Sequence, residues 1–559
     1  MEMRKCGGAP ARRQMTLVVT AALLSMGGNA QAFEFDTGNA DLQVRWDNTI
    51  RYNLASRVEK RDRKIGNSAV ADEGTYSFDR GELVANRLDL LSELDVVYKG
   101  NMGFRVSGAG WYDAAYGDDS HGNPNAPLSG IPSYTNHEYS HYTKRLYAGP
   151  SGELLDAFVF GNFDAGEVPV RLKAGRHAVF WGESLFLGGS MHSVSYAQMP
   201  LDLQKGFATP GVEAKELFRP LNQISGQAQV TDTLSVAAQY FLDWEAYRYP
   251  EGGTYLGPVD FAFNGPDRQF LSRGLGFATN GKPLEPQKTG EYGVSLRWSP
   301  EMLDGTLGLY YRRYADKLPQ VLLTQVGPGV SRYNMIYADG IDLFGVSLAK
   351  NIAGISVGAE FSYRRNTPLN AQVLGVAPGV PERGETNGPR GDTFHGLVNF
   401  LGVVPKTAVF DAANWAAEVT WSRWDKVRSG ENLFYAEGFA PCRGRDKWDG
   451  CTTKDFWGLG LSFTPTWYQV LPGVDLSAPM SIAGGISGNA ATVFGGNERS
   501  GNYSVGLSAD IFQKYRIDLK YVDYFGRYRD NGTAVTTQNG FTTLLKDRGF
   551  VSLTFKTTF

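Results

Sequence analysis

The sequence predicts an all-β fold, a transmembrane antiparallel up-and-down β-barrel of about eighteen strands with short periplasmic turns and long extracellular loops. Three observations lead to this prediction. The last twelve residues, 548–559, alternate apolar and polar side chains and stop on an aromatic, Phe559. Segments of the same period recur from residue 40 onward, and Gly, Tyr and Trp are abundant. A period of two predicts strands, and a barrel in lipid must leave no open strand edge.

The composition of the 559-residue chain fits a single barrel. It contains 68 Gly, 28 Tyr and 11 Trp at a mean hydropathy of -0.29, so it is rich in turn and interface residues and poor in continuous apolar runs. Lys and Arg total 55 against 58 Asp and Glu, and the net charge of -3 gives no basic surface for a nucleic-acid partner. No low-complexity linker divides the chain, so we predict one domain over residues 33–559.

The N-terminal residues have the pattern of a secretory signal peptide. Four basic residues among the first thirteen precede an apolar run over residues 15–26, and Ala30-Gln31-Ala32 follows as a cleavage site. We therefore expect residues 1–32 to be removed after Ala32 and the mature protein to begin at Phe33. The alternative, a membrane anchor, needs roughly 20 apolar residues, more than this run offers. Together with the strand pattern, the signal predicts the Gram-negative outer membrane as the location.

The predicted strands repeat one pattern of about ten alternating residues. The clearest case is a hairpin, in which residues 501–511 alternate apolar and polar side chains and residues 515–521 do the same after a short turn. A soluble sandwich would hide the apolar face in a core, whereas a barrel turns it to the lipid and turns its charges inward. Further strands are expected near Val44, Leu90, Phe104, Phe158, Leu172, Ala228, Val236, Val294, Leu309, Val346, Val357, Val398, Val419, Leu461 and Ile482.

The predicted connections alternate between turns of a few residues and long loops, which is the plan of an outer-membrane barrel. Because both chain ends then lie on the periplasmic side, the number of strands must be even. Including the weak segment 393–403 gives about eighteen, and sixteen results if one hairpin near residues 153–177 lies outside the wall. The long loops are expected over residues 57–85, 117–150, 178–220, 248–288, 317–340, 365–390, 425–453, 486–500 and 528–547.

The two faces of the strands differ in chemistry. Outward positions carry aromatics, several near strand ends where aromatic girdles lie: Trp46, Trp298, Tyr311, Tyr363, Trp415 and Trp421. Inward positions carry both signs of charge in similar number, which favours a hydrated, charge-paired lumen over a pore selective for one sign of ion. The simpler role of each charge is to brace the wall. The lumen charges are Arg45, Asp47, Arg87, Asp89, Glu93, Asp95, Arg171, Lys173, Arg297, Arg312, Glu360, Arg364, Glu418, Arg516, Asp518 and Lys520.

Cys442 and Cys451 are the two cysteines that remain after removal of the signal peptide. In an oxidising compartment their spacing predicts a local disulfide that pins a loop. A metal pair is the weaker alternative, because no His or further Cys is near in the sequence.

The sharpest match to a catalytic motif is the pentapeptide His137-Glu138-Tyr139-Ser140-His141, which fits the H-E-x-x-H pattern of zinc metalloproteases. Such a site needs both imidazoles on one helical face and a third ligand. The motif lies in a loop rich in Gly, Pro, Asn, Ser and Tyr without helical periodicity, so ordinary surface histidines are the better interpretation. Ser190 with His192, or His177, forms no identifiable triad. We therefore predict no catalytic residue, no metal and no cofactor.

The most unusual stretch is Arg171–Asn222, which becomes apolar and Gly-rich without alternation and is too long for a simple turn. Two interpretations stay open: residues 176–221 fold into the lumen as a constriction or hydrophobic path, or they cap neighbouring loops from outside. In the first, Arg176 would fix the loop through an ion pair with Glu183 or Glu213, and the adjacent aromatics would contact an apolar solute. The expected path residues are Arg176, Phe180, Trp181, Glu183, Glu213 and Lys215.

Three stretches carry a family resemblance, and they read FVFGNFDAGEVPVRLKAGRHAVFWGES, PGVEAKELFRPLNQISGQAQVTDTLSVAAQY and GFVSLTFKTTF. The most specific parts are GRxxxxWGES from Gly175 to Ser184 and PGxExKE from Pro210 to Glu216. Over nearly the whole mature chain the sequence resembles the proteobacterial outer-membrane barrel family called domain of unknown function 1302. Members look like barrels encoded beside a periplasmic lipoprotein-sorting-like protein and a resistance-nodulation-division (RND) type permease. The resemblance implies movement of a hydrophobic molecule or lipid, with these two proteins as partners.

These inferences combine into one functional expectation, an outer-membrane channel or transporter for hydrophobic or amphipathic small molecules or lipids. Its expected partners are the outer-membrane lipids, the apolar solute and the barrel-assembly machinery. Two alternatives stay open. One is an outer-membrane hydrolase that uses the loop histidines His137, His141 or His192, and the other is a plugged docking or structural barrel of a lipid-export system.

Overall fold

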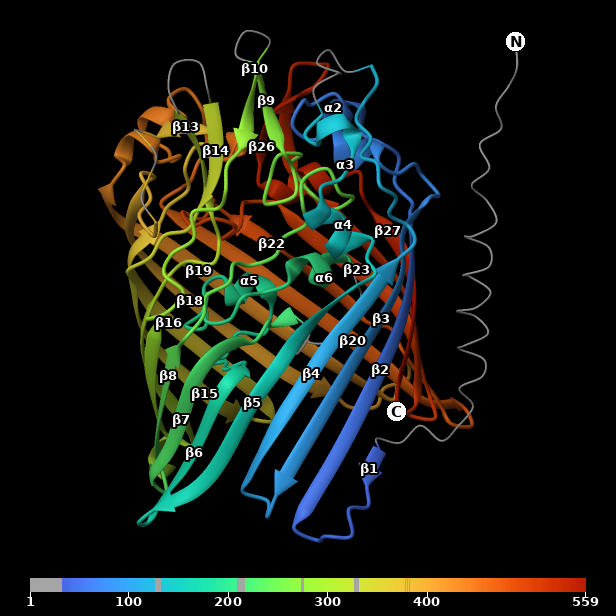
Figure 1. Ribbon diagram of the computed structural model, residues 1–559, viewed down its shortest axis with the longest axis vertical. Coiled ribbons are helices and arrows are strands. Elements are labelled where there is room, and N and C mark those ends of the chain that lie inside the picture. The colour runs from blue at the N-terminus through green and yellow to red at the C-terminus, as the bar shows by residue number, and fades with distance from the viewer. Residues whose placement is uncertain are drawn as a thin grey trace.

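A computed structural model describes residues 33–125, 132–208, 217–272, 276–325, 331–377, 379, 381 and 383–559. Within these residues the chain forms a closed antiparallel β-barrel of eighteen strands (Figure 1). The predicted signal peptide and two of the predicted path residues, Glu213 and Lys215, lie outside the described ranges.

Successive wall strands are neighbours in the sheet, which makes the barrel an up-and-down one. Each is built from residues that alternate apolar and polar side chains, so one face suits lipid and the other suits the lumen. The wall strands are β2 (Leu42–Arg57), β3 (Leu83–Tyr98), β4 (Met102–Asp113), β5 (Ser151–Ala165), β6 (Val168–His177), β7 (Leu221–Thr231), β8 (Leu234–Phe241), β11 (Tyr292–Trp298), β12 (Gly305–Tyr314), β15 (Ile341–Ile352), β16 (Ile355–Pro368), β18 (Arg390–Val404), β19 (Ala412–Ser429), β20 (Asp455–Leu471), the pair β21 (Val474–Ser477) and β22 (Met480–Ser487), β23 (Gly501–Ile511), β24 (Tyr515–Phe525) and β27 (Phe550–Thr558).

The pair β21 and β22 forms one wall strand that is interrupted at Pro479. Both parts pair with β20 on one side and with β23 on the other. Proline has no N–H to give to the ladder, so the break at this position is expected.

The wall closes between its first and last strands, β2 and β27. Nine residue pairs join them. Asn48 and Phe559 also exchange backbone hydrogen bonds of 2.7 and 2.9 Å. The predicted number of about eighteen strands is confirmed, and the sixteen-strand alternative is wrong because β5 and β6 pair with β4 and β7 in the wall.

Side chains alternate across the wall as the period of two requires. In β27, Leu553 is 47% exposed on the outer face, while Ser552 and Thr554 on either side of it are only 1% exposed. Leu507 of β23 and Leu519 of β24 are likewise exposed on the outside. An apolar outer face needs no partner in hydrocarbon, whereas the polar inner face is satisfied by other side chains and by water.

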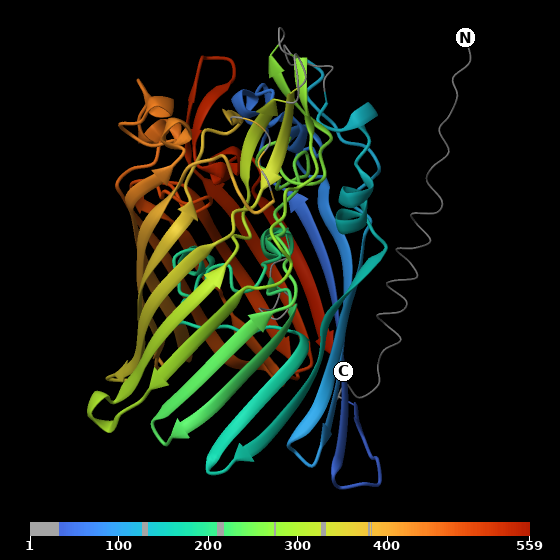
Figure 2. The same ribbon diagram turned by 60° about the vertical axis from the view of Figure 1, so that its left-hand side comes forward.

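The long connections gather at one end of the barrel and the short turns at the other (Figures 1 and 2). At the loop end a small second sheet contains β9 (Arg268–Ser272), β10 (Gly276–Asn280), β13 (Gln320–Gln325), β14 (Ser331–Ile336) and β17 (Gly375–Ala377). β25 (Arg527–Asp530) and β26 (Val535–Asn539) form a hairpin there. At the opposite end, β1 (Phe33–Phe35) pairs with residues 44–46 near the start of β2 (Figure 1).

The helices are short. A disulfide joins Cys442 and Cys451 in the loop between β19 and β20. None of the helices in the described ranges is long and apolar enough to span a membrane. They are α2 (Arg63–Gly66), α3 (Asp72–Tyr76), α4 (His141–Tyr147), α5 (Leu187–Ser190), α6 (Leu203–Ala208), and the 3-10 helices η1 (Thr135–His137), η2 (Glu301–Leu303), η3 (Glu431–Leu433), η4 (Ala440–Cys442), η5 (Lys447–Asp449) and η6 (Phe541–Leu545).

Candidate functional site: a segment folded into the lumen

The connection that follows β6 runs into the barrel, and we call its described part, residues 178–208, the lumen segment. Figure 2 shows its helices α5 and α6 enclosed by the wall strands. Every residue from Met191 to Lys205 is buried. The polar groups of this segment therefore need partners, and inward-facing side chains of the wall supply many of them.

Two buried arginines of the wall hold backbone carbonyls of the lumen segment. Arg364 of β16 donates from Nη2 to the carbonyl oxygens of Met191 and Ser193, at 2.9 and 3.1 Å. Its guanidinium also lies 4.1 Å from the centre of the Tyr196 ring. Such contacts to a charged donor are stronger than neutral hydrogen bonds, so Arg364 fixes the path of the backbone.

Arg312 of β12 repeats this arrangement one step along the segment. Its Nη1 donates to the carbonyl oxygens of Val194 and Tyr196, at 3.0 and 2.6 Å. Both arginines are at most 1% exposed. Two buried arginines of the wall thus bind successive backbone carbonyls of the lumen segment. In a charge-paired lumen they would bind carboxylates instead.

Two wall carboxylates hold backbone N–H groups of the same segment. Glu360 of β16 accepts from Val194 N at 2.7 Å and from Glu183 N. Glu418 of β19 accepts from Leu185 N at 2.8 Å and from Phe186 N at 3.2 Å. These lumen charges were predicted as such, but their contacts to a distant loop backbone were not.

Glycines make this close approach possible. A Cβ atom at Gly189 would collide with the Glu418 carboxylate, and one at Gly182 would collide with Glu360. Gly182 also has φ of 90°, a conformation that L side chains rarely adopt. The glycines of this stretch therefore allow its backbone to approach the wall carboxylates closely.

A pair of histidines makes a further connection between the lumen segment and its surroundings. His192 Nε2 lies 2.7 Å from the carbonyl oxygen of Gly495, so it must carry the proton and donate. Its Nδ1 then accepts from His395 Nδ1 at 3.0 Å, and His395 Nε2 accepts from the Thr393 hydroxyl at 2.8 Å. Each neutral ring is held in one tautomer, and the chain of bonds joins β18 to the loop before β23.

The predicted ion pair of Arg176 with Glu183 is wrong. Arg176 Nη1 lies 3.0 Å from Glu245 Oε1, in the loop after β8. Arg176 lies on β6, opposite Asn222 at the start of β7. Glu183 lies seven residues further along the chain, inside the lumen, where its carboxylate is 3.9 Å from the guanidinium of Arg297. The alternative pairing with Glu213 falls outside the described residues.

The two predicted aromatic path residues have different environments. Trp181 is 8% exposed, its ring lies 6.1 Å from that of Tyr310, and its backbone N–H donates to Gln198. Phe180 is 43% exposed and contacts Phe218 at a ring distance of 4.6 Å. Of the two rings, Phe180 is the one that a solute can reach.

Other predicted lumen charges form ion pairs with neighbours on the wall. Lys520 lies on β24, the strand that also carries one of these pairs. Pairs of this kind brace the sheet and keep both signs of charge in the lumen. They are Arg45–Asp47 at 2.8 Å, Arg87–Asp89 at 3.0 Å, Arg516–Asp518 at 3.0 Å, and Glu93–Arg105.

The H-E-x-x-H motif does not lie on one helix. His137 ends η1 with φ of 60°, Glu138 is extended and paired with Lys144 at 2.5 Å, and His141 begins α4. Among the described residues, no group of three or more His, Cys, Asp or Glu is placed to hold a metal ion. The Ser190 hydroxyl donates to a backbone carbonyl at 2.8 Å, so this site lacks the serine–histidine contact of a triad as well.

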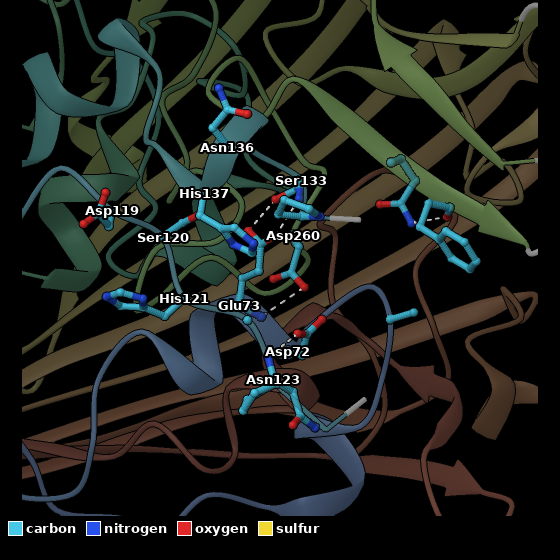
Figure 3. Close-up of a pocket in the computed structure, with 16 residues that line it drawn as sticks. Asp72, Glu73, Asp119, Ser120, His121, Asn123, Ser133, Asn136, His137 and Asp260 are labelled. Atoms are coloured by element: carbon cyan, nitrogen blue, oxygen red, sulfur yellow. Dashed lines mark hydrogen bonds between the residues drawn. The ribbon is translucent and has the colours of Figure 1, made fainter. Parts of the chain in front are cut away.

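An acidic cavity of about 530 Å³ lies among the outer loops (Figure 3). Glu73 accepts from the backbone N–H and the hydroxyl of Ser133, both at 2.5 Å, and Asp260 accepts from Glu73 N at 3.3 Å. Burial raises the pKa of Glu73 to about 7, and burial together with the charge of Asp72 raises that of Asp260 well above its usual range. The residues come from three loops far apart in the sequence, and no sequence motif predicted the cavity.

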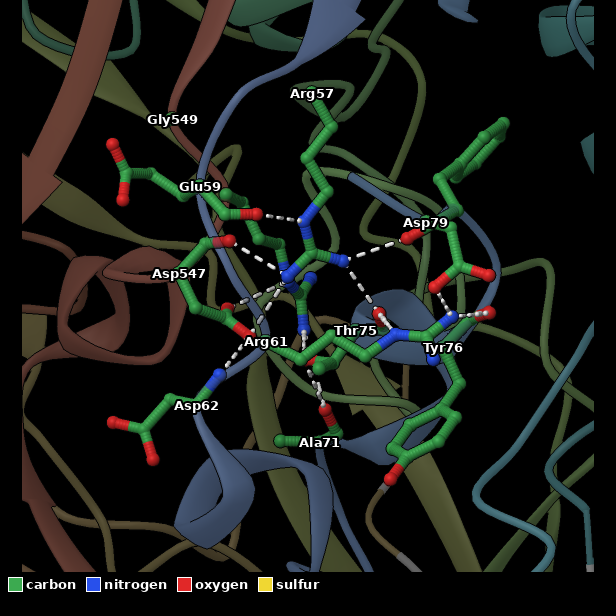
Figure 4. Close-up of polar contacts among 12 residues, drawn as sticks. Arg57, Glu59, Arg61, Asp62, Ala71, Thr75, Tyr76, Asp79, Asp547 and Gly549 are labelled. Atoms are coloured by element: carbon green, nitrogen blue, oxygen red, sulfur yellow. Dashed lines mark hydrogen bonds and ion pairs between the residues drawn. The ribbon is translucent and has the colours of Figure 1, made fainter. Parts of the chain in front are cut away.

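A network of buried arginines ties the first outer loop to the barrel seam (Figure 4). Arg57 donates to the carbonyl oxygen of Thr75 at 2.6 Å and forms an ion pair with Asp547 at 3.0 Å. Arg548 donates to the carbonyl oxygen of Tyr255 at 3.0 Å. Both arginines are 0% exposed, so their contacts are made without competition from solvent.

The closed wall, the apolar outer face and the polar lumen define a membrane-spanning β-barrel of the outer-membrane type, with one loop folded into its lumen. The sequence matches the family described as "Protein of unknown function (DUF1302)" over residues 13–559, and the chain belongs to this family. No protein with a curated description matches it.

Solved structures with a similar outline are outer-membrane proteins. Pseudomonas aeruginosa OpdK, solved with vanillate, is 8% identical at a TM-score of 0.38, and the match covers 92% of this chain and 98% of OpdK. P. aeruginosa OccD3 (OpdP) is 11% identical at 0.39, covering 95% and 93%. Acinetobacter baumannii OccAB4 is 8% identical at 0.38, covering 95% and 99%. At these values the likeness supports no inference about a solute.

Proposed function

We propose that this protein is an outer-membrane channel that passes hydrophobic or amphipathic small molecules, with the lumen segment as its selective element. One observation carries the proposal. The segment exposes Phe180, Leu185 and Leu187, at 43%, 45% and 38%, although it lies inside a polar barrel. Phe180 packs against Phe218 on one side, but the exposed parts of these three side chains meet the hydrated lumen, where they suit contact with an apolar solute.

The wall contacts support the same proposal. The arginines and glutamates of the wall bind the backbone of the segment, so the side chains of Phe180, Leu185 and Leu187 are not needed to hold it and stay exposed. A rigid backbone that presents apolar side chains is the arrangement that binding sites for small apolar molecules share. In this proposal the periplasmic lipoprotein-sorting-like protein and the RND-type permease continue the route on the inner side.

Flux into liposomes tests the proposal. Phenyl glucoside and glucose differ by one aromatic ring, and we expect the triple variant Phe180→Ser, Leu185→Ser, Leu187→Ser to slow phenyl glucoside at least threefold while glucose flux stays the same. Met302→Ser is the matched control, because Met302 is 89% exposed in η2, the short connection between β11 and β12, and is not part of the lumen segment. If the triple variant changes the flux of neither solute, the segment does not select.

The burial of residues 191–205 favours a second candidate, a plugged barrel that serves as a docking unit of a lipid-export system. Planar-bilayer recording separates the two. A channel gives discrete conductance steps, whereas a plugged barrel stays silent at every voltage at which the lipid remains intact.

A further inference from the structure

A small apolar cavity of about 70 Å³ lies among the outer loops, apart from the acidic cavity described above. Residues of five loops line it, from the stretches 258–263, 319–321, 370–373 and 493–494 and from Phe541. None of the lining residues is charged, and Gln320 and Asn370 are the polar ones among them.

The amide groups of these two polar residues are already engaged. Gln320 Nε2 donates to the carbonyl oxygens of Leu369 and Pro389, at 2.7 and 3.0 Å, and Asn370 Nδ2 donates to Ala490 at 2.8 Å. The Oε1 atom of Gln320 is buried and has no partner in the described part of the chain. The cavity therefore offers an ion no counter-charge. An uncharged molecule is the occupant whose transfer from water into the cavity costs the least free energy.

The aromatic rings of Phe263, Phe494 and Phe541 line the cavity, and the ring of Tyr249 behind them completes a stack. Phe494 lies 4.2 Å from Tyr249 and 4.7 Å from Phe541, measured between ring centres, and Tyr249 lies 5.3 Å from Phe263 in a nearly parallel arrangement. Three separate loops contribute these rings. Flat aromatic surfaces of this kind favour a planar apolar ligand.

Backbone strain is concentrated at the same place. Phe263, Leu374 and Phe494 have φ of 74°, 58° and 55°, values that bulky side chains rarely adopt. Phe263 and Phe494 line the cavity, and Leu374 follows Val373, which also lines it. Such residues cluster where the surroundings hold a ligand site in shape, and an ordinary loop would relax them.

We propose that this cavity binds an uncharged six-membered ring, either a free ring compound or the ring of a larger apolar molecule, before the molecule enters the lumen. The proposal rests on the channel function above. A cavity of about 70 Å³ is several times the ~10–15 Å³ that one water needs and has room for one ring. Val493 and Phe494 pack against the same continuous hydrophobic cluster that contains Trp181 and Val194, so apolar contacts connect the cavity with the lumen segment.

Crystals of the full-length barrel soaked with brominated rings test the site, because bromine is located by its anomalous signal. We expect 4-bromotoluene to give a peak in the cavity and 4-bromobenzoate, its charged counterpart, to give none. Val493→Phe should remove the peak, since Val493 lines the cavity, and Val376→Phe on β17 should keep it, since Val376 is 59% exposed and is not a lining residue. Val373→Phe, at the exposed rim, replaces Val493→Phe if that variant fails to fold.

A wild-type crystal without bromine in the cavity, or a peak of equal height with 4-bromobenzoate, would overturn the proposal. Binding at crystal concentration only is a further negative outcome, and liposome flux detects it: a working site requires Val493→Phe to slow phenyl glucoside at low concentration at least threefold, with glucose unchanged. The two proposals fail separately. Bromine in the cavity of a barrel that passes no solute would retain the ring-binding site but reject both its role before entry into the lumen and the channel function, whereas an empty cavity in a barrel that conducts would reject the site alone.

Discussion

Replacing Arg364 by methionine should loosen the lumen segment while the wall stays closed. The variant loses two hydrogen bonds to carbonyls and a cation–π contact. A hydrogen bond from a charged group contributes about 1.5–3 kcal/mol and a desolvated cation–π contact up to ~2 kcal/mol. Part of this is offset, because Arg364 Nε and Nη1 are buried and find no partner among the described residues, and their desolvation costs about 1–3 kcal/mol each.

The net loss is about 2–3 kcal/mol, which corresponds to a roughly 30- to 140-fold larger population of the released segment. Two measurements check it: the open probability in planar bilayers and the rate of amide hydrogen exchange over residues 187–196. Arg516→Met is the control, because Arg516 also faces the lumen but pairs with Asp510 and Asp518 on the wall. Unchanged open probability together with unchanged exchange in Arg364→Met would refute the reasoning.

Three further predictions concern the outer loops. The raised pKa of Glu73, about 7 against 4.5 unfolded, means that the loops are most stable below pH 4.5 and lose this contribution as the pH rises through 7. Proteolysis should therefore be faster at pH 8 than at pH 5, and Glu73→Gln should reduce the difference, with Asp260 responsible for the remainder. Reducing the disulfide between Cys442 and Cys451 should cost the loop about 2–3 kcal/mol and speed its proteolysis, with no change in the gel mobility of the folded barrel. Arg57→Ala should destabilise the barrel by about 3–5 kcal/mol in urea unfolding, because Arg57 loses its buried bonds to two loop carbonyls and Asp547 keeps only the longer ion pair with Arg548, at 3.7 Å. An unchanged midpoint would contradict this.

The wall was predictable because its signal is local. A period of two places side chains on alternate faces whatever the strand pairs with, so residues 501–511 and 515–521 identify a hairpin without knowledge of the rest. The even strand number followed from the positions of the chain ends, and it required the weak segment 393–403, which is β18 in the wall.

The site was predictable only in part, because its contacts join residues far apart in the sequence. The composition of the stretch 171–222 marked it as unusual, but nothing in it showed that Glu418, 233 positions beyond Leu185, would accept its backbone N–H. The partner of Arg176 was missed for the same reason, since Glu245 comes from the loop after β8, 69 positions away. Alternation predicts which wall charges face inward and carries no information about what they bind there.

The seam between β2 and β27 also constrains the order of assembly. The hydroxyls of Thr49 and Thr558 lie 2.9 Å apart across it although the two residues are 509 positions apart in the sequence. Joining such distant residues costs more conformational entropy than forming a local hairpin, so the seam forms after the hairpins. Arg312, Glu360 and Glu418 hold the lumen segment from strands that follow it in the chain. These contacts can form only after β12, β16 and β19 have joined the sheet. The lumen segment is therefore fixed in place late, well after its own flanking strands β6 and β7 have paired with each other, and the closed lumen is completed by contacts between the two halves of the chain.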